Sequence, residues 1–276
     1  MILIAGPCVI ESREQLLKIG EELSPIASHP DVEFYFKASF DKANRTSLHS
    51  YRGPGLKRGL ELLGEVKKRF GYRLLTDVHE SWQIEPVSEV VDVIQIPAFL
   101  CRQTDLLIGA AKSGKIVNIK KGQFMNPTDM RFSVLKVLET RGWEEASYLN
   151  SYRAKVWVTE RGTTFGYGNL VVDMRSFPTI RQFAPVIFDA THSVQLPGAG
   201  GGKSGGDRRF VFPLARGAAA VGVDGFFFET HSNPAEALSD GPNMITPTQL
   251  REFLPTLLEI SRLVKPTLNL YEGGSN

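Results

Sequence analysis

The sequence predicts an α/β fold, a single (β/α)8 TIM barrel in which eight parallel strands alternate with eight helices. Short apolar segments alternate along the chain with longer segments whose apolar residues recur at helical spacing. Nearly every short apolar segment is followed directly by polar or ionisable residues, which a barrel enzyme gathers at the carboxyl ends of its strands. An open doubly wound sheet is the structural alternative, but it would concentrate such residues at one switch point.

The composition is that of an ordinary globular protein. The chain has 276 residues, of which 42% are hydrophobic and 22% charged, so we expect one catalytic domain over residues 1–276. A net charge of +2 indicates no nucleic-acid or membrane surface, and no apolar stretch is long enough to span a bilayer. Residues 1–4 show no signal peptide, so we expect a cytoplasmic protein whose Cys8 and Cys101 form no disulfide.

The predicted strands are short, as expected of parallel strands buried on both faces. They cover residues 2–5, 32–38, 73–78, 93–97, 116–120, 156–159, 186–188 and 225–228. The predicted helices cover roughly residues 16–26, 56–66, 83–90, 103–112, 127–141, 171–183, 210–221 and 250–264. Ser12 is a candidate N-cap for the first of these helices. Residues 142–155 show neither period, which indicates an extended loop or a frayed helix end.

The stretch from residue 37 to residue 55 is unusually rich in cations and hydroxyl groups. Its basic and polar side chains include those of Lys37, Lys42, Asn44, Arg45, Thr46, Ser47, Ser50 and Arg52. Arginine forks match phosphate or carboxylate oxygens, and lysine adds a point charge, so this loop is suited to binding oxyanions. The alternative is an ordinary solvated basic loop. A position after a strand favours the functional interpretation, because α/β enzymes keep their sites there.

Further cations and a glutamine stand at other predicted strand ends. Lys120, Arg161 and Gln95 would face the same mouth as Lys37 and Lys42. Four converging cations indicate a substrate with at least two negative charges, such as a phosphorylated carboxylate. Each cation has a structural alternative, which is pairing with a carboxylate such as Asp77 or Glu160. The glycine-rich loop 196–209 lacks the complete P-loop pattern, so we interpret it as a lid or a second phosphate contact.

Candidate metal ligands come from strand ends that a closed barrel would make neighbours. Cys8, His192 and Glu229 follow the first, seventh and eighth strands, and Asp240 lies on the loop after the eighth. A thiolate, an imidazole and carboxylates suit a divalent metal of the Zn, Fe or Mn kind. His79 and His231 are competing ligands. The alternative is a buried structural cysteine and a hydrogen-bonded histidine, and the spacing alone does not choose between them.

Several motifs together resemble the 3-deoxy-D-manno-octulosonate 8-phosphate synthase family. They are F-K-A-S-F-D-K-A-N-R-T-S, H-S-Y-R-G-P-G, I-Q-I-P-A-F-L-C-R-Q-T-D, N-I-K-K-G-Q-F, T-E-R-G-T-T-F-G-Y and D-A-T-H-S-V-Q-L-P. The resemblance implies a transferase that condenses phosphoenolpyruvate with D-arabinose 5-phosphate and water, releasing inorganic phosphate. It also implies a role in lipopolysaccharide biosynthesis and a cytoplasmic homotetramer.

The resemblance assigns roles residue by residue. Lys37, Lys42, Lys120 and Arg161 resemble the phosphoenolpyruvate contacts, with Gln95 also binding substrate. Asn44 and Arg45 resemble the arabinose 5-phosphate contacts, beside Thr46 where the family often has serine. Arg102 resembles an arginine that reaches the active site of a neighbouring subunit, and Ser204 a serine of the closing loop. Cys8, His192, Glu229 and Asp240 match the metal ligands, and the implied catalytic residues are Lys37, Lys42, His192 and Asp240.

Cys8 decides between two branches of that family, because the metal-independent branch has asparagine there. The metal would either polarise the aldehyde or activate the water, and the sequence leaves this open. An alternative activity is 3-deoxy-D-arabino-heptulosonate 7-phosphate synthesis from erythrose 4-phosphate. That family has K-P-R-T-S where this chain has Asn44, which favours the pentose. A sugar-phosphate sensor without catalytic activity is the alternative from another functional class.

Overall fold

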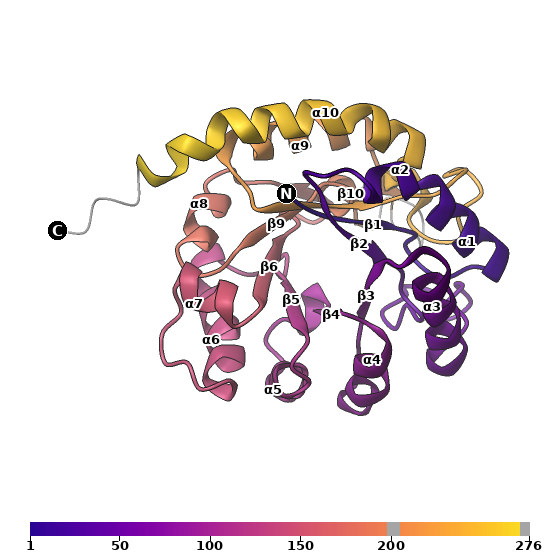
Figure 1. Ribbon diagram of the computed structural model, residues 1–276, viewed down its shortest axis with the longest axis horizontal. Helices are drawn as coiled ribbons and strands as arrows, with labels where there is room; N and C mark the ends of the chain where they lie inside the picture. The colour runs from indigo at the N-terminus through magenta and orange to yellow at the C-terminus, as the bar shows by residue number, and fades with distance from the viewer. Residues whose placement is uncertain (198–204, 271–276) are drawn as a thin grey trace.

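Eight parallel strands close into a barrel, which confirms the predicted fold. The computed structural model describes residues 1–197 and 205–270, and its strands follow the closed order β1-β12-β9-β6-β5-β4-β3-β2 (Figure 1). The barrel strands are β1 (Ile2–Gly6), β2 (Glu33–Lys37), β3 (Arg73–Asp77), β4 (Val93–Ile96), β5 (Ile116–Lys120), β6 (Val156–Glu160), β9 (Val186–Asp189) and β12 (Gly225–Glu229). Closure depends on β1, which pairs with both β2 and β12.

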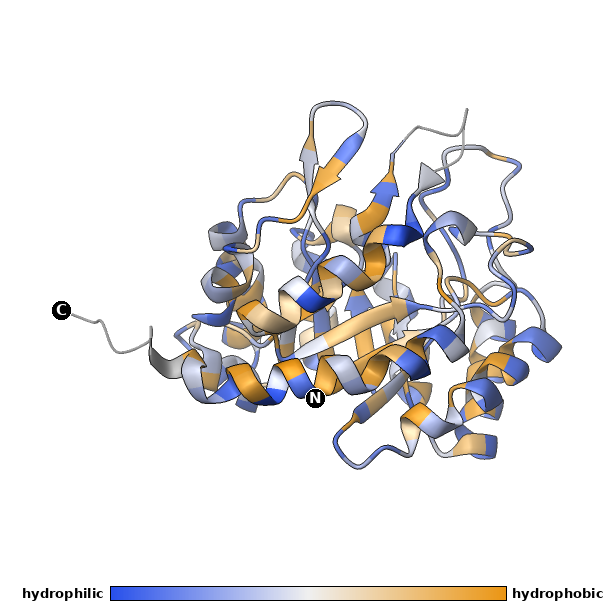
Figure 2. Cartoon of the chain, turned by 90° about the horizontal axis from the view of Figure 1, so that it is seen from above, coloured by the Kyte–Doolittle hydropathy of each residue, from blue (hydrophilic) through white to orange (hydrophobic). Residues whose placement is uncertain are grey.

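Helices surround the strands (Figure 1). They are α1 (Arg13–Glu22), α2 (Ser24–Ala27), α3 (Leu56–Phe70), α4 (Ile84–Val90), α5 (Thr104–Lys112), α6 (Met130–Thr140), α7 (Tyr148–Arg153), α8 (Ser176–Arg181), α9 (Val211–Val221) and α10 (Pro247–Val264). Figure 2 shows mixed apolar and polar stripes on these helices, as expected where one face packs on a sheet. The predicted N-cap is confirmed, because the Ser12 hydroxyl accepts the backbone N–H of Gln15 at 3.1 Å.

The barrel interior has an apolar layer below a polar one. The apolar layer consists of Ile4, Tyr35, Leu75, Val93, Trp157, Ile187 and Phe227. Side chains alternate along a strand, so the residue two positions further on faces the interior again, nearer the carboxyl end. Those positions hold Lys37, Asp77, Gln95, Thr159, Asp189 and Glu229, all buried. The same alternation that builds the core therefore builds a charged mouth above it.

Three predicted segments differ from the structure. Residues 163–171, of which the sequence placed only Val171 in a helix, form the antiparallel hairpin of β7 (Thr163–Phe165) and β8 (Asn169–Val171). The predicted helix 171–183 was therefore wrong at its start, and only α8 is helical there. The segment 142–155 contains α7, whose N-cap Ser147 accepts the Asn150 N–H at 3.3 Å. The first helix is divided into α1 and α2, since Pro25 has no N–H to continue the α1 ladder.

Two further predictions concern the cysteines and the membrane. Cys8 and Cys101 are both buried and free, which confirms the expectation that they form no disulfide. Within residues 1–197 and 205–270, no helix combines the length and the apolar character needed to cross a bilayer.

Two short strands lie beside the barrel mouth. β10 (Gln195–Leu196) pairs antiparallel with β11 (Gly205–Gly206). In the sequence, β10 and β11 stand before and after the central part of the glycine-rich loop. Ser204 belongs to that part, and it lies outside the described residues. The predicted role of Ser204 therefore stays a prediction.

Candidate active site

A compact group of three potential metal ligands lies where β12 meets β1. The Cys8 thiol, the Glu229 carboxylate and the Asp240 carboxylate place ligand atoms within 4.8 Å of one another. Cys8 follows β1 and Glu229 ends β12, so the pairing of these two strands brings them together. The Cys8 thiol lies 3.0 Å from the Ser239 hydroxyl and donates to Asp240 Oδ2 at 3.4 Å. Among residues 1–197 and 205–270, nothing hydrogen-bonds Glu229 Oε2, a buried oxygen.

His192 borders this group from the end of β9. Its Nε2 lies 3.4 Å from Glu229 Oε2 and 3.8 Å from Asp240 Oδ2. Its other ring nitrogen, Nδ1, lies 2.7 Å from Asp189 Oδ2. The Asp189 carboxylate beside Nδ1 favours the tautomer that carries its proton on Nδ1. This tautomer leaves the Nε2 lone pair available to bind a metal ion. A thiol, an imidazole and two carboxylates, one with a buried oxygen that accepts no hydrogen bond from the described residues, therefore fit a borderline divalent cation.

The protonation of this group reflects burial and its neighbouring charges. Burial, reinforced by the Glu229 carboxylate, raises the pKa of Cys8 above its usual range. Burial alone would raise the pKa of Glu229, but His192 and the nearby lysines outweigh it and hold that pKa well below the usual range. A metal bound here would have to displace the Cys8 proton, whereas Glu229 is already an anion.

Two lysines of the basic stretch lie against the same carboxylate. The Lys37 ammonium, almost fully buried, donates to Glu229 Oε1 at 2.7 Å and to the Cys8 carbonyl at 2.8 Å. The Lys42 ammonium lies 3.9 Å from Glu229 Oε1 and is slightly exposed at the mouth. Burial tends to lower the pKa of Lys42, but Cys8, Glu229 and other acidic neighbours raise it overall. Lys42 is therefore a cation in contact with both the ligand group and solvent.

Arg161 contacts His192 directly, whereas Lys120 is connected to His192 by Asp189. Asp189 Oδ2 also accepts the Lys120 ammonium, which lies 3.3 Å from His192 Nδ1 and 4.1 Å from the centre of the Phe227 ring. Burial is the main reason that the pKa of Lys120 falls, and Asp189 opposes it. Arg161 donates to the His192 carbonyl at 2.8 Å and to Gln195 Oε1 at 2.7 Å. Lys120 and Arg161 therefore reach His192 from two adjacent strands.

The rest of the basic stretch forms the rim of the mouth. Arg45 Nε donates to the Tyr51 carbonyl at 2.9 Å, and no described residue hydrogen-bonds its buried Nη2. Asn44 and Thr46 are exposed, as is Arg102. Gln95 lies deeper, where its Oε1 accepts the Asn118 amide at 3.2 Å. The structure thus places the inner cations around the ligand group and the predicted sugar contacts at the solvent edge.

Comparison with known proteins extends over almost the whole chain. Residues 1–266 match the DAHP synthetase I family. The chain belongs to this family. A protein named 2-dehydro-3-deoxyphosphooctonate aldolase from Wolinella succinogenes is 68% identical over 263 residues, covering 95% of this chain and 100% of the relative. Proteins of the same name from Helicobacter hepaticus and Helicobacter pylori are 64% and 59% identical, each over at least 95% of both chains.

His79 and His231, which the sequence offered as competing metal ligands, have other partners. His79 Nε2 lies 2.9 Å from Asp77 Oδ2. His231 Nε2 lies 2.9 Å from Gln15 Nε2, and His231 Nδ1 accepts the Asn233 N–H. Both rings are therefore engaged outside the group formed by Cys8, Glu229 and Asp240.

Sequence reasoning missed three residues that contact the predicted site. Asp189 has the most contacts of the three, because it accepts hydrogen bonds from both Lys120 and the His192 backbone. Its D-x-x-H spacing after a strand was the available signal, since a carboxylate there can orient the histidine. Gln195 and Ser239 gave no sequence signal. Each is recognised only through its contact, with Arg161 and Cys8 respectively.

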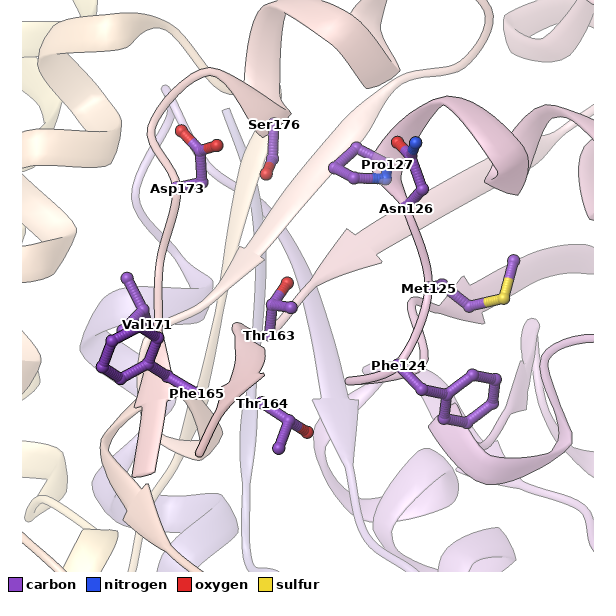
Figure 3. Close-up of a pocket in the computed structure, with 10 residues that line it drawn as sticks. All are labelled: Phe124, Met125, Asn126, Pro127, Thr163, Thr164, Phe165, Val171, Asp173 and Ser176. Atoms are coloured by element: carbon purple, nitrogen blue, oxygen red, sulfur yellow. The ribbon is translucent and has the colours of Figure 1, made fainter. Parts of the chain in front are cut away.

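A hollow of about 330 Å³ lies outside the mouth (Figure 3). Figure 3 shows it between the segment that carries Phe124 and Met125 and the β7–β8 hairpin that carries Thr163 and Phe165. None of the predicted site residues lines this hollow. It therefore does not compete with the mouth as the candidate active site.

Proposed function

We propose that this protein condenses phosphoenolpyruvate with D-arabinose 5-phosphate and water, giving 3-deoxy-D-manno-octulosonate 8-phosphate and inorganic phosphate. The observation that carries the proposal is the full-length similarity, at 68% identity, to a protein whose name describes this eight-carbon phosphate. The clustered cations at the barrel mouth supply the matching chemistry, because both substrates carry phosphate and one also carries a carboxylate. The enzyme would be a transferase.

The inner cations are suited to phosphoenolpyruvate. Lys120 and Arg161 come from adjacent strands and meet at His192, and Lys42 lies 3.9 Å from Glu229 Oε1 of the ligand group. We assign Lys42, Lys120 and Arg161 to the phosphate and carboxylate of this substrate, with Gln95 below them. Lys37 is held by Glu229 and two backbone carbonyls, so we assign it to fixing Glu229 as well as to substrate charge.

The reaction needs two reactants held face to face. C3 of the enol attacks the aldehyde carbon, water adds at C2, and phosphate leaves by C–O cleavage. The basic residues neutralise phosphate and carboxylate and fix the attack geometry, which replaces a bimolecular encounter by an oriented one. Asn44, Arg45 and Thr46, at the rim, would hold the sugar phosphate. We assign His192 and Asp240 to the reacting oxygens, where charge develops during the reaction.

We propose that Cys8, His192, Glu229 and Asp240 bind Zn, Fe or Mn. The support is the compact geometry, the orientation of His192 by Asp189, and the buried Glu229 Oε2, which accepts no hydrogen bond from the described residues. A bound divalent ion would supply a Lewis acid that polarises an aldehyde or lowers the pKa of water. Cys8 as a thiolate, Glu229 and Asp240 would provide the negative charge that retains such an ion. Lys37 and Lys42 would balance that negative charge.

The proposed assembly is a cytoplasmic homotetramer in which Arg102 reaches a neighbouring active site. Arg102 is exposed just before α5, where it is free to meet a second chain. Phe99 lies three residues earlier and exposes 57% of its surface, so a second chain meeting Arg102 would also meet this ring. Charge on Arg102 would then complete the sugar-phosphate site from outside.

Product analysis tests the proposed reaction. Phosphoenolpyruvate is incubated with arabinose 5-phosphate or with erythrose 4-phosphate, and the products are identified by mass spectrometry. We expect the eight-carbon 3-deoxy acid phosphate from the pentose and little seven-carbon product from the tetrose. A predominant seven-carbon product would instead establish the heptulosonate activity. Binding of both substrates without any product would support the sensor alternative.

A further inference from the structure

A second layer of buried charge lies directly behind the inner cations. Lys121 follows Lys120, and Glu160 precedes Arg161, so each occupies the opposite side of its strand end from the cation beside it. Lys121 is 0% exposed and Glu160 is 1% exposed. The Lys121 ammonium lies 3.4 Å from Glu160 Oε1. A buried ion pair is costly to desolvate, so its retention behind the mouth calls for a physical reason.

Glu160 holds the backbone on both sides of the Arg161 α-carbon. Its Oε1 accepts the backbone N–H of Arg161 at 2.9 Å and that of Gly162 at 2.7 Å. Two successive N–H groups therefore converge on one anion, and the turn continues through Gly162, whose φ of +91° is a left-handed conformation that glycine adopts without strain. The carboxylate therefore fixes the direction in which the Arg161 side chain leaves the end of β6.

Lys121 ties this turn to the neighbouring strand end. Its ammonium donates to Thr163 Oγ1 at 3.0 Å, to the Gly122 carbonyl at 3.3 Å and to the Gly162 carbonyl at 3.4 Å. These contacts join the loop after β5 to the turn after β6. The Lys121 charge also neutralises Glu160, which would otherwise be a buried anion balanced only by backbone N–H groups.

We propose that Lys121 and Glu160 are positioning residues that set the geometry of Arg161 and its separation from Lys120. The inference rests on the proposed function, in which these two cations bind phosphoenolpyruvate. Neither Lys121 nor Glu160 touches the substrate in this account. Arg161 depends on such support because, among the described residues, its guanidinium makes two hydrogen bonds, both through Nη2, and none through the buried Nε.

Substitutions at Glu160 separate positioning from simple stability. Glu160→Ala removes the acceptor of both N–H groups, and we expect the KM for phosphoenolpyruvate to rise about tenfold or more, equivalent to about 1.4 kcal/mol. The KM for the aldose should stay within about twofold. Glu160→Gln keeps an acceptor oxygen but loses the charge, so it should recover most of the lost affinity. If Glu160→Ala does not fold, Glu160→Asp replaces it, because the shortened carboxylate keeps its charge but moves away from the two N–H groups.

Lys121→Met and the double variant test the ion pair itself. Lys121→Met alone leaves Glu160 as an unpaired buried anion, so it should weaken phosphoenolpyruvate binding more than Lys121→Met combined with Glu160→Gln. Lys67→Met is the matched control. Lys67 donates to Asp92 at 3.0 Å and to the Val90 carbonyl, but Asp92 lies before β4, at the opposite end of the barrel. This control should lower Tm without changing the KM for phosphoenolpyruvate.

The result that overturns the inference is a folded Glu160→Ala or Glu160→Asp variant with lowered Tm and a KM for phosphoenolpyruvate within twofold of the parent. The parent enzyme distinguishes this failure from that of the proposed function. If the parent forms no product with either aldose, the proposed function fails. The inference is then decided by calorimetric titration with phosphoenolpyruvate alone, in which the same variants should show the same loss of affinity, and an unchanged affinity would refute it.

Discussion

Asp189→Asn is the most informative single substitution at the mouth, because one carboxylate oxygen serves two partners. Asp189 is fully buried, and its Oδ2 accepts from both His192 Nδ1, at 2.7 Å, and the Lys120 ammonium. Asparagine has nearly the same shape but places an N–H₂ donor where one of the two oxygens stood. If that donor faces His192, the ring must accept at Nδ1 and carry its proton on Nε2. A protonated Nε2 cannot bind a metal ion.

The magnitude follows from the loss of one oriented ligand. Removing the carboxylate partner of a metal-bound histidine costs about 10- to 100-fold in metal affinity, or about 1.4–2.7 kcal/mol. Lys120 would also lose its negative partner, so the KM for phosphoenolpyruvate should change in the same variant. The assay is competition for Zn²⁺ against a chromophoric chelator, which reports metal affinity without requiring turnover.

Asp77→Asn is the matched control for this prediction. Asp77 is also a buried carboxylate paired with a histidine ring, at 2.9 Å, but that ring belongs to His79, outside the ligand group. Its substitution should leave Zn²⁺ affinity within about twofold. Equal Zn²⁺ affinity of Asp189→Asn and the parent would refute the role of Asp189 and remove His192 from the proposed site.

Three further predictions concern single side chains. Cys8→Asn should lower the bound metal, measured by atomic absorption, because it removes the softest ligand; unchanged metal content would exclude Cys8. Arg102→Ala should raise the KM for arabinose 5-phosphate and leave that for phosphoenolpyruvate unchanged, and equal effects on both would contradict its assignment. Phe227→Ala should lower the free energy of unfolding by about 3–5 kcal/mol in urea titrations, since the ring is fully buried in the interior apolar layer below Lys120. A loss below about 1 kcal/mol would show that the layer closes over the cavity.

The sequence predicted the barrel well because its signal is repeated. Each strand carries its own apolar run and its own polar end, so an error at one strand does not change the architecture. Lys37, Gln95 and Glu229 could be placed at one mouth for the same reason, since the carboxyl ends of parallel strands face one side. The hairpin β7–β8 was missed because its strands have three residues each, too few to show a two-residue period.

Contacts between distant segments were the part that the sequence did not contain. Spacing identified His192 as a candidate ligand, but not that Asp189 fixes its ring. It offered Asp77 and Glu160 as partners for mouth lysines, whereas Lys37 pairs with Glu229 and Lys120 pairs with Asp189. Glu160 pairs instead with Lys121, behind the mouth. Partner choice depends on side-chain direction and register across the barrel, which local patterns do not specify.

Phosphate release from phosphoenolpyruvate tests the central claim most directly. It is measured with arabinose 5-phosphate before chelation, after chelation, and after addition of Zn²⁺, Fe²⁺ or Mn²⁺. The proposed function and metal group predict release with the pentose, loss on chelation and recovery with at least one of these ions. Release that is indifferent to the chelator would contradict the metal assignment of Cys8, His192, Glu229 and Asp240. The absence of release with the pentose under every metal condition would contradict the proposed condensation itself.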